Sequence, residues 1–160
     1  MATKFIARRP LNLAQQAAGI RQTLPWFEVA LAGRLLVARG TLVPNLITRK
    51  YRVRIEYEGN GNRPEVYVEE PKLLRRPQEP DEPIPHTYES TMPGKERPCA
   101  FYPAMDWDGT RPIASSVVPW LMSWLFDYEV WHATGHWHGG GLHPTLNSRS
   151  AKRLRRKAAT

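Results

Sequence analysis

Tyr51-Arg52-Val53-Arg54-Ile55-Glu56-Tyr57-Glu58 is the stretch of sequence that decides the fold. Apolar and charged residues alternate along it, and this period of two is typical of a strand with one buried face. A turn sequence, Gly-Asn-Gly-Asn, occupies residues 59–62, and residues 65–69 predict a second strand, which Pro71 stops. The sequence therefore predicts an antiparallel hairpin within a sheet.

The segments before this hairpin predict further strands and a helix. Residues 26–43 are rich in Phe, Val and Leu, with two glycines as interruptions, which fits two strands or one long bent strand with a bulge. Residues 11–21 carry apolar residues at helical spacing, so we expect a short helix there, ended by Pro25.

The chain after the hairpin divides into a proline-rich crossing and a second helix. Seven prolines fall between Pro71 and Pro98, where no periodicity is evident, and a loop of that length is usually functional or mobile. An apolar helix is expected from Ser115 or Ser116, either of which could cap it, to Gly135. The order of helix, antiparallel meander, proline-rich segment and carboxy-terminal helix predicts an α+β fold with helices packed on a sheet.

The charge of the chain is concentrated at its end. The 160 residues carry a net charge of +8 and fit one domain, which we assign to residues 1–146. Residues 147–160 are predicted to form a basic, disordered tail, since no acid follows Glu129. Contact of this tail with nucleic acid or an acidic partner is the alternative interpretation. The tail contributes six positive charges, from Arg149, Lys152, Arg153, Arg155, Arg156 and Lys157.

Targeting signals are not evident in the sequence. The amino end has no apolar core of a secretory signal, and no apolar run approaches the length of a membrane span. We therefore expect a cytoplasmic protein with a reduced thiol, with no membrane association.

Cys99 is the only cysteine, which excludes an intramolecular disulfide. A buried structural thiol and a nucleophile are the two remaining interpretations. A cysteine that closes an irregular loop is more exposed than one in a strand, and Lys95, Arg97 and His86 lie near enough in sequence to lower its pKa. These neighbours favour a nucleophile, whereas free cysteines in general are among the most buried residues.

Three motifs resemble those of the bacterial ubiquitin-conjugating-like (UBC-like) proteins. Those proteins typically read Pro-His-x-Tyr, then a cysteine followed by apolar or aromatic residues, then a Tyr-Glu-x-Trp helix end and a Trp-x-Gly-Gly-Gly-x-x-His close. They occur in antiphage defence operons of the CBASS kind, here the short type without a fused activating domain. The matching stretches are Pro85-His86-Thr87-Tyr88, Cys99-Ala100-Phe101-Tyr102, and residues 124–144, which read Trp-Leu-Phe-Asp-Tyr-Glu-Val-Trp-His-Ala-Thr-Gly-His-Trp-His-Gly-Gly-Gly-Leu-His-Pro.

The resemblance, which runs from about residue 11 to 144, implies the UBC-like fold with a four-stranded meander and an acyl-carrying cysteine. Cys99 would form a thioester with the carboxy-terminal glycine of a ubiquitin-like protein or of a CD-NTase, a cGAS-like nucleotidyltransferase. The acyl group would then pass to an amine. Either a separate activating enzyme supplies the acyl group, or the chain works directly on its partner, because no adenylating domain fits in 160 residues.

Two further residues are candidates for the catalytic site. His86 is expected to hydrogen-bond a loop backbone, as in the eukaryotic motif, with proton transfer or a plain loop position as alternatives. No Asn stands beside His86 to bind an oxyanion. Tyr88 is the candidate replacement through its hydroxyl group, and packing is its other interpretation.

A metal site is the alternative use of the late histidines. His136, His138 and His143 would reach a common ion only if the glycine turn folds back, and we expect neither a metal nor a cofactor. Trp124, Tyr128 and Trp131 are predicted to belong to the core, with Trp137 folding back over them, and not to a ligand site.

Two other functions remain open from the sequence. One is a catalytically inactive UBC-like binding module, which a buried Cys99 would favour. The other is a small basic nucleic-acid-binding protein, whose support is the tail alone.

Overall fold

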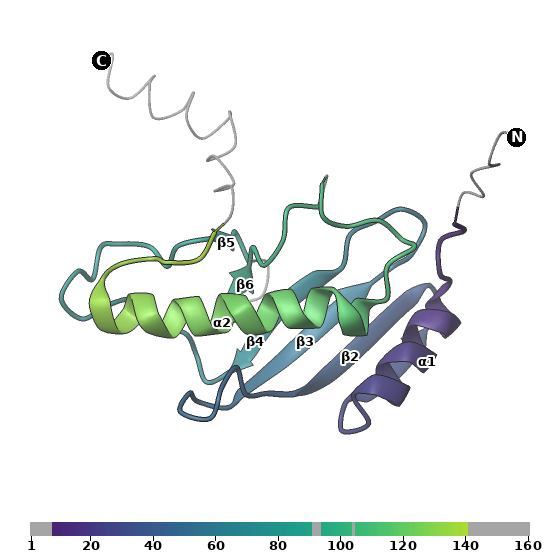
Figure 1. Ribbon diagram of the computed structural model, residues 1–160, viewed down its shortest axis with the longest axis horizontal. Helices are drawn as coiled ribbons and strands as arrows, with labels where there is room; N and C mark the ends of the chain where they lie inside the picture. The colour runs from purple at the N-terminus through teal and green to yellow at the C-terminus, as the bar shows by residue number, and fades with distance from the viewer. Residues whose placement is uncertain (1–7, 91–93, 104, 141–160) are drawn as a thin grey trace, which may run out of the picture.

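The computed structural model describes residues 8–90, 94–103 and 105–140 (Figure 1). A four-stranded antiparallel sheet has the order β1-β2-β3-β4, and a separate two-stranded ladder joins β5 to β6. The predicted α+β class and the four-stranded meander are therefore confirmed. The elements are α1 (Leu13–Thr23), β1 (Glu28–Ala32), β2 (Leu35–Leu42), β3 (Tyr51–Tyr57), β4 (Glu65–Glu70), β5 (Thr87–Tyr88), β6 (Arg97–Pro98), the 3₁₀ helix η1 (Ile113–Ser115) and α2 (Val117–Thr134).

The sheet follows the alternation read from the sequence. On β3 the apolar residues are buried and the charged ones between them face outward. Of the two readings of residues 26–43, two strands is the right one, with a turn at Gly33, whose φ of 60° lies in the left-handed region. Gly40 is an interior residue of β2. It leaves room for the Phe27 ring, from which a Cβ on Gly40 would lie only 2.0 Å.

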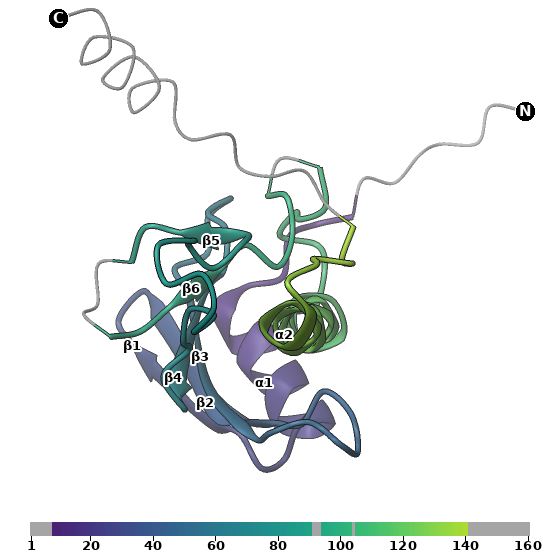
Figure 2. The ribbon, with the colours of Figure 1, turned by 90° about the vertical axis from the view of Figure 1, so that its left-hand side faces the viewer.

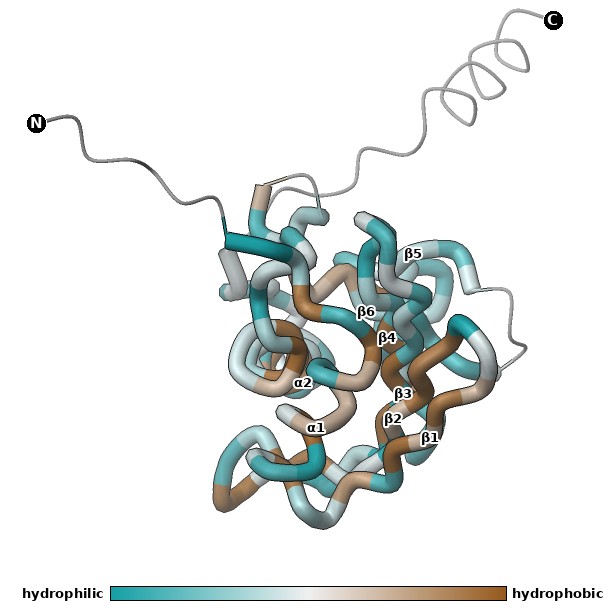
Figure 3. The backbone as a smooth tube through the Cα atoms, turned by 90° about the vertical axis from the view of Figure 1, so that its right-hand side faces the viewer, coloured by the Kyte–Doolittle hydropathy of each residue, from teal (hydrophilic) through white to brown (hydrophobic). Residues whose placement is uncertain are grey.

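Both helices cover one face of the sheet (Figure 2). Many residues of the sheet are hydrophobic, and α1 and α2 lie beside them (Figure 3). The core fills the space between these two layers, because the buried residues of β2 and β3 form one cluster with those of α1 and α2.

Helix α1 begins two residues later than predicted, because Asn12 caps it. The Asn12 side chain accepts a hydrogen bond from the Gln15 backbone N–H at 2.8 Å, and the Gln15 side chain accepts one from the Asn12 N–H at 2.9 Å. The buried Gln16 side chain bonds to the Arg111 carbonyl and the Ile113 N–H, at 2.9 and 2.8 Å. These two bonds fix α1 to the segment that leads into α2.

Helix α2 ends where the sequence predicted but starts without the expected cap. Gly135 adopts φ 82° and its N–H donates to the Trp131 carbonyl at 2.7 Å. Ser116 occupies the cap position, but its hydroxyl donates to the Pro112 carbonyl at 2.6 Å and makes no capping bond. Seven residues of α2 are buried, including the predicted core residues Trp124 and Tyr128.

The proline-rich crossing contains more regular structure than its sequence predicted. Within its described residues, β5 and β6 form a short ladder, and Val68 of β4 forms a bridge to Glu96. The Tyr128 hydroxyl bonds to both the N–H and the carbonyl of Leu74, at 2.9 and 3.1 Å. These contacts attach the crossing to the sheet on one side and to α2 on the other.

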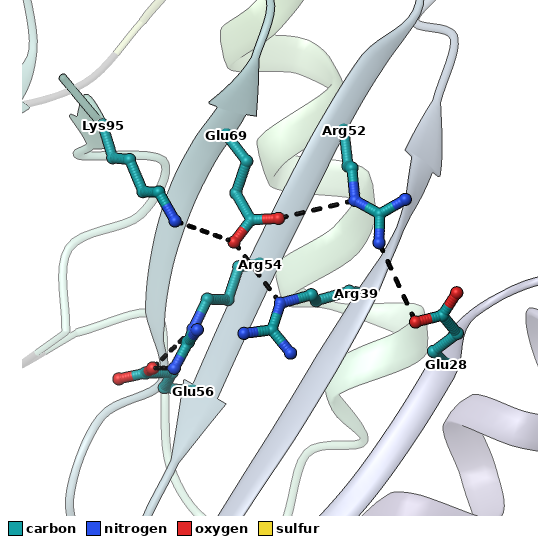
Figure 4. A network of polar contacts seen from close by, with 7 residues as sticks. All are labelled: Glu28, Arg39, Arg52, Arg54, Glu56, Glu69 and Lys95. Carbon is teal, nitrogen blue, oxygen red and sulfur yellow. Dashed lines mark hydrogen bonds and ion pairs between the residues drawn. The ribbon is translucent and has the colours of Figure 1, made fainter. Parts of the chain in front are cut away.

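The outer face of the sheet carries paired charges (Figure 4). The Glu69 carboxylate, only 10% exposed, lies 3.2 Å from Lys95, 3.4 Å from Arg39 and 3.5 Å from Arg52. Arg54 pairs with Glu56 beside them. These cations therefore form ion pairs within the protein. The basic tail predicted at residues 147–160 lies outside the described residues.

Among the described residues, none of the helices has the length and apolar character needed to cross a membrane.

Candidate active site

The short β5–β6 ladder brings the three candidate site residues together. Thr87 pairs with Pro98, and Tyr88 pairs with Arg97. Cys99 follows β6 directly, and its N–H donates to the His86 carbonyl at 2.7 Å. Backbone pairing thus brings together residues that lie eleven to thirteen positions apart in the sequence.

Tyr88 contacts the thiol of Cys99. The Cys99 Sγ lies 3.1 Å from the Tyr88 hydroxyl oxygen, and a weaker contact of 3.8 Å reaches the Phe101 carbonyl. Either group can donate, because a thiol and a phenol each carry one hydrogen, whereas toward a thiolate only the tyrosine donates. The contact therefore exists in both protonation states of the sulfur, and Tyr88 is its donor only when the sulfur is ionised.

The pKa of Cys99 is nevertheless raised above its ordinary value of 9.0, because burial disfavours the charged thiolate. The Tyr88 hydrogen bond and the positive charge of Arg63 both lower the pKa, but burial outweighs them. The expectation of a lowered pKa is therefore wrong. The lysine and arginine expected to lower it are also not the cation that does so. Arg97 pairs with Glu65 and Lys95 pairs with Glu69 instead.

Arg63 is a site residue that the sequence analysis missed. Its guanidinium carbon lies 4.8 Å from the centre of the Tyr88 ring, and that of Arg97 lies 5.2 Å from it. Arg63 lies between β3 and β4, far from Cys99 in sequence, so only the folded sheet brings its charge near the sulfur. Burial, followed by the bond to Cys99, raises the pKa of Tyr88 to about 12, so the hydroxyl keeps its proton at neutral pH.

His86 supports the site through its backbone and its ring. It is buried, with φ 51° in the left-handed region, and its carbonyl accepts from Cys99 N–H and, at 2.9 Å, from Trp124 Nε1. Its ring stacks on Trp137, with centroids 4.9 Å apart and planes 26° apart. The His86 carbonyl thus links Cys99 to α2, and the hydrogen bond from His86 to a loop backbone that the sequence analysis expected stays a prediction.

Cys99 opens into a hollow of about 420 Å³, which we call the Cys99 hollow. Trp124 belongs to the core, as predicted, and it also lines this hollow. Two carboxylates, Asp106 and Asp127, stand in the wall as well, and burial raises the pKa of Asp127 while His138 opposes that shift. The lining consists of His86, Cys99, Ala100, Phe101, Tyr102, Met105, Asp106, Trp120, Ser123, Trp124, Asp127, Trp137 and Gly140.

The late histidines show no metal-binding arrangement within the described part of the chain. The rings of His136 and His138 lie 6.4 Å apart, and the residues that the structure describes contain no group of three metal-ligating side chains. His143, the third member of the proposed set, lies outside the described residues.

A helix followed by a four-stranded meander, with a cysteine beside the sheet and a second helix packed on it, is the arrangement expected of a ubiquitin-conjugating-like (E2-like) protein. A family model described as Type II CBASS E2 protein matches residues 16–144, and the chain belongs to this family. Membership implies an E2-like role in CBASS antiphage defence alongside other CBASS components. The comparison with curated proteins gave no match.

Proposed function

We propose that the chain is a ubiquitin-conjugating-like acyl carrier. Cys99 takes the carboxy-terminal glycine of a partner as a thioester and then passes the acyl group to an amine. The observation that carries the proposal is the Tyr88 hydroxyl 3.1 Å from the Cys99 sulfur, at the edge of an open hollow. Acyl transfer needs a nucleophile, access to it and a hydrogen-bond donor beside it.

Tyr88 has two successive tasks in this mechanism. It first donates its hydroxyl to the Cys99 thiolate, which favours the reactive form together with the charge of Arg63. Once the sulfur has attacked the carbonyl carbon, the same hydroxyl stands next to the oxygen on which negative charge develops. A neutral tyrosine serves both tasks, because its raised pKa keeps the proton in place.

The Cys99 hollow supports the choice of a glycine-ended donor. Its walls are largely aromatic, and a terminal glycine brings its carbonyl to the sulfur without a side chain that would have to fit there. At the rim, Tyr102 and Met105 are 40% and 75% exposed, which gives a partner protein an apolar contact next to the cysteine. We propose a CD-NTase of the same defence system, or a ubiquitin-like protein, as donor, with a separate activating enzyme supplying the activated acyl group.

The test is to incubate the full chain with a candidate donor, an activating enzyme and ATP, and to resolve the products on non-reducing gels. We expect an adduct that dithiothreitol removes and that Cys99→Ala lacks. Ser123→Ala is the matched control, because Ser123 lines the same hollow without touching the sulfur. A Cys99→Ala variant that forms the same adduct as the unaltered chain would refute the proposal.

A catalytically inactive binding module is the second candidate, and the raised pKa of the half-buried Cys99 favours it. Such a module binds the same donor without a covalent bond. Co-elution of chain and donor in gel filtration, unaffected by Cys99→Ala and with no adduct under any activating condition, would favour this alternative.

A further inference from the structure

The loop between β2 and β3 presents two large apolar side chains to solvent. Leu46 and Ile47, which we call the Leu46 tip, are 103% and 92% exposed, the highest values among the large apolar side chains that the structure describes. The loop extends past the end of the sheet on the side where α2 lies (Figure 2). Two adjacent aliphatic side chains with so little contact to the body leave their apolar area in water, and such a feature indicates a contact with another molecule.

Hydrogen bonds hold this tip away from its own chain. Asn45 Oδ1 accepts from the N–H groups of Ile47 and Thr48 at 2.9 and 3.0 Å, and the Thr48 hydroxyl accepts from the Asn45 N–H at 3.0 Å. Just beyond the tip, the Glu129 carboxylate of α2 accepts from the Arg49 N–H at 3.0 Å. The loop is therefore fixed on both sides of the tip, and its two side chains stay directed outward.

An open groove of about 660 Å³, which we call the Phe126 groove, lies beside the tip. Pro119, Met122 and Phe126 form its apolar wall, because residues three, four and seven positions apart share one face of a helix. Phe126 is 42% exposed, so this wall is accessible from solvent. Pro44, two residues before the tip, lines the groove as well. The groove thus offers the apolar surface that the tip lacks.

The tip and the groove also carry opposite charges. Arg49 and Lys50 follow the tip by two and three residues and are both exposed. The groove contains Asp127, and none of its described lining residues is a lysine or an arginine. Opposite charges of this kind favour contact between the loop of one molecule and the groove of another.

A two-fold axis is the symmetry that joins these two features. When two copies face each other across such an axis, a projection and a groove that lie side by side on one copy stand opposite the groove and the projection of the other. We propose that the chain forms a symmetric dimer in which the Leu46 tip of each copy enters the Phe126 groove of its partner. This dimer goes beyond the proposed function and does not depend on it.

The dimer interface borders the Cys99 hollow, because Ser123 and Asp127 line both the hollow and the groove. The partner's loop therefore lies beside the entrance to the cysteine. Tyr102 and Met105, the exposed rim residues, line the hollow but not the groove, so the rim stays open to a donor in the dimer.

Sedimentation velocity of the full chain over a range of concentrations tests this dimer. We expect reversible association in the micromolar range, since two small contacts lie at the low end of interface sizes. Leu46→Asn/Ile47→Asn should raise the dissociation constant at least about tenfold. Leu31→Asn/Leu74→Asn is the matched control, because these two leucines are exposed outside the tip and the groove, and it should leave the constant unchanged. A chain that stays monomeric, or a dimer that the tip substitutions leave unaffected, would overturn the proposal.

Mixing two variants tests whether the tip pairs with the groove. Phe126→Lys places a cation in the groove, where it repels the partner's basic loop, so this variant should dimerise as weakly as Leu46→Asn/Ile47→Asn. A mixture of the two should form a heterodimer more strongly than either variant associates with itself, because one unaltered tip then meets one unaltered groove. Circular dichroism checks that each variant is folded. An unaltered chain that dimerises while the mixture recovers nothing would place the interface elsewhere and overturn the proposal.

A lipid surface is the competing occupant of the tip, and the same variants distinguish it. Co-sedimentation with vesicles of phosphatidylcholine and phosphatidylglycerol should show no binding that depends on the tip. A chain that is monomeric in solution, yet binds these vesicles and loses that binding in Leu46→Asn/Ile47→Asn, would overturn the dimer and assign the tip to a lipid contact.

Discussion

At the scale of single residues, burial and hydrogen bonding oppose each other at Cys99. The half-buried position stabilises the neutral thiol, while the Tyr88 hydroxyl and Arg63 stabilise the thiolate. Burial prevails, so the two favourable contacts determine how much thiolate remains near neutral pH. Removing either contact should therefore have a measurable effect on reactivity.

Tyr88→Phe should raise the pKa of Cys99 further, because the hydroxyl that lowers it is lost. The pH profile of alkylation by iodoacetamide, followed by intact mass, should shift to higher pH, and the rate at pH 7 should fall. Tyr67→Phe is the control, since the Tyr67 hydroxyl bonds to Glu65. An unchanged profile in Tyr88→Phe would show that the contact has no influence on the thiol.

At the scale of elements, the carboxy-terminal end of α2 depends on one glycine. Gly135 has φ 82°, and a Cβ there would lie 2.7 Å from the Arg76 guanidinium, which is itself only 9% exposed and pairs with Glu79. Both the backbone and the space beside it exclude a side chain. The turn that directs Trp137 toward His86 starts at this residue.

Gly135→Ala should destabilise the protein by about 1–2 kcal/mol, the cost of a left-handed residue that carries a Cβ. Urea denaturation measures this change. Gly19→Ala is the matched control inside α1, where nothing lies within 4 Å, and it should stabilise by roughly 0.5–1 kcal/mol. If the two substitutions changed the free energy of unfolding equally, Gly135 would not act as the left-handed cap of α2.

The sheet has its own pH dependence through Glu69. Burial alone would raise the pKa of this carboxyl, but Lys95 and Arg39 outweigh it, and the pKa lies below the ordinary 4.5. The resulting stability is complete above pH 4.5 and is lost as the pH falls through the lower, folded-state pKa.

Glu69→Gln should therefore cost most stability at neutral pH, and the difference from the unaltered chain should shrink as the pH falls below 4.5. Urea midpoints measured from pH 7 to pH 3 test this expectation. Glu28→Gln is an exposed comparison, since the Glu28 side chain is 78% accessible and its partner Arg52 is 44% accessible, so this pair should contribute little. A constant difference across the range would show that Glu69 acts by packing only.

At the scale of the whole molecule, Trp124 joins the core to the site. Its ring is 3% exposed and stacks on Tyr128, while its indole N–H donates to the His86 carbonyl that also holds Cys99. One side chain therefore contributes both to stability and to the position of the cysteine.

Trp124→Ala should cost about 3–5 kcal/mol, as measured by urea denaturation. Trp124→Phe keeps most of the buried area but leaves the His86 carbonyl without this donor, so it should cost less and still slow adduct formation at Cys99. If Trp124→Phe forms the adduct at the unaltered rate, the hydrogen bond does not position the cysteine.

The sequence predicted the parts of the fold that periodicity determines. The alternation of apolar and charged residues predicted β3, and the apolar face predicted α2. Gly135 predicted where α2 ends. The β5–β6 ladder was missed because strands of two residues have no period to read.

The candidate site was predictable only in part, because its electrostatics arise from segments distant in sequence. His86, Tyr88 and Cys99 came from a family resemblance, and the structure brings them together. Arg63 and Asp127 reach the site from the β3–β4 connection and from α2, so no local pattern marks them.

The central claim is that Cys99 carries an acyl group. The intact mass of the chain after reaction with the donor tests this claim most directly. After incubation with the donor and an activating enzyme, we predict a species whose mass is the sum of chain and donor less one water, with the link mapped to Cys99 and cleaved by neutral hydroxylamine. The account would be contradicted if no covalent adduct of chain and donor formed under these conditions. It would also be contradicted if the link mapped to another residue while Cys99 could still be alkylated in the adduct.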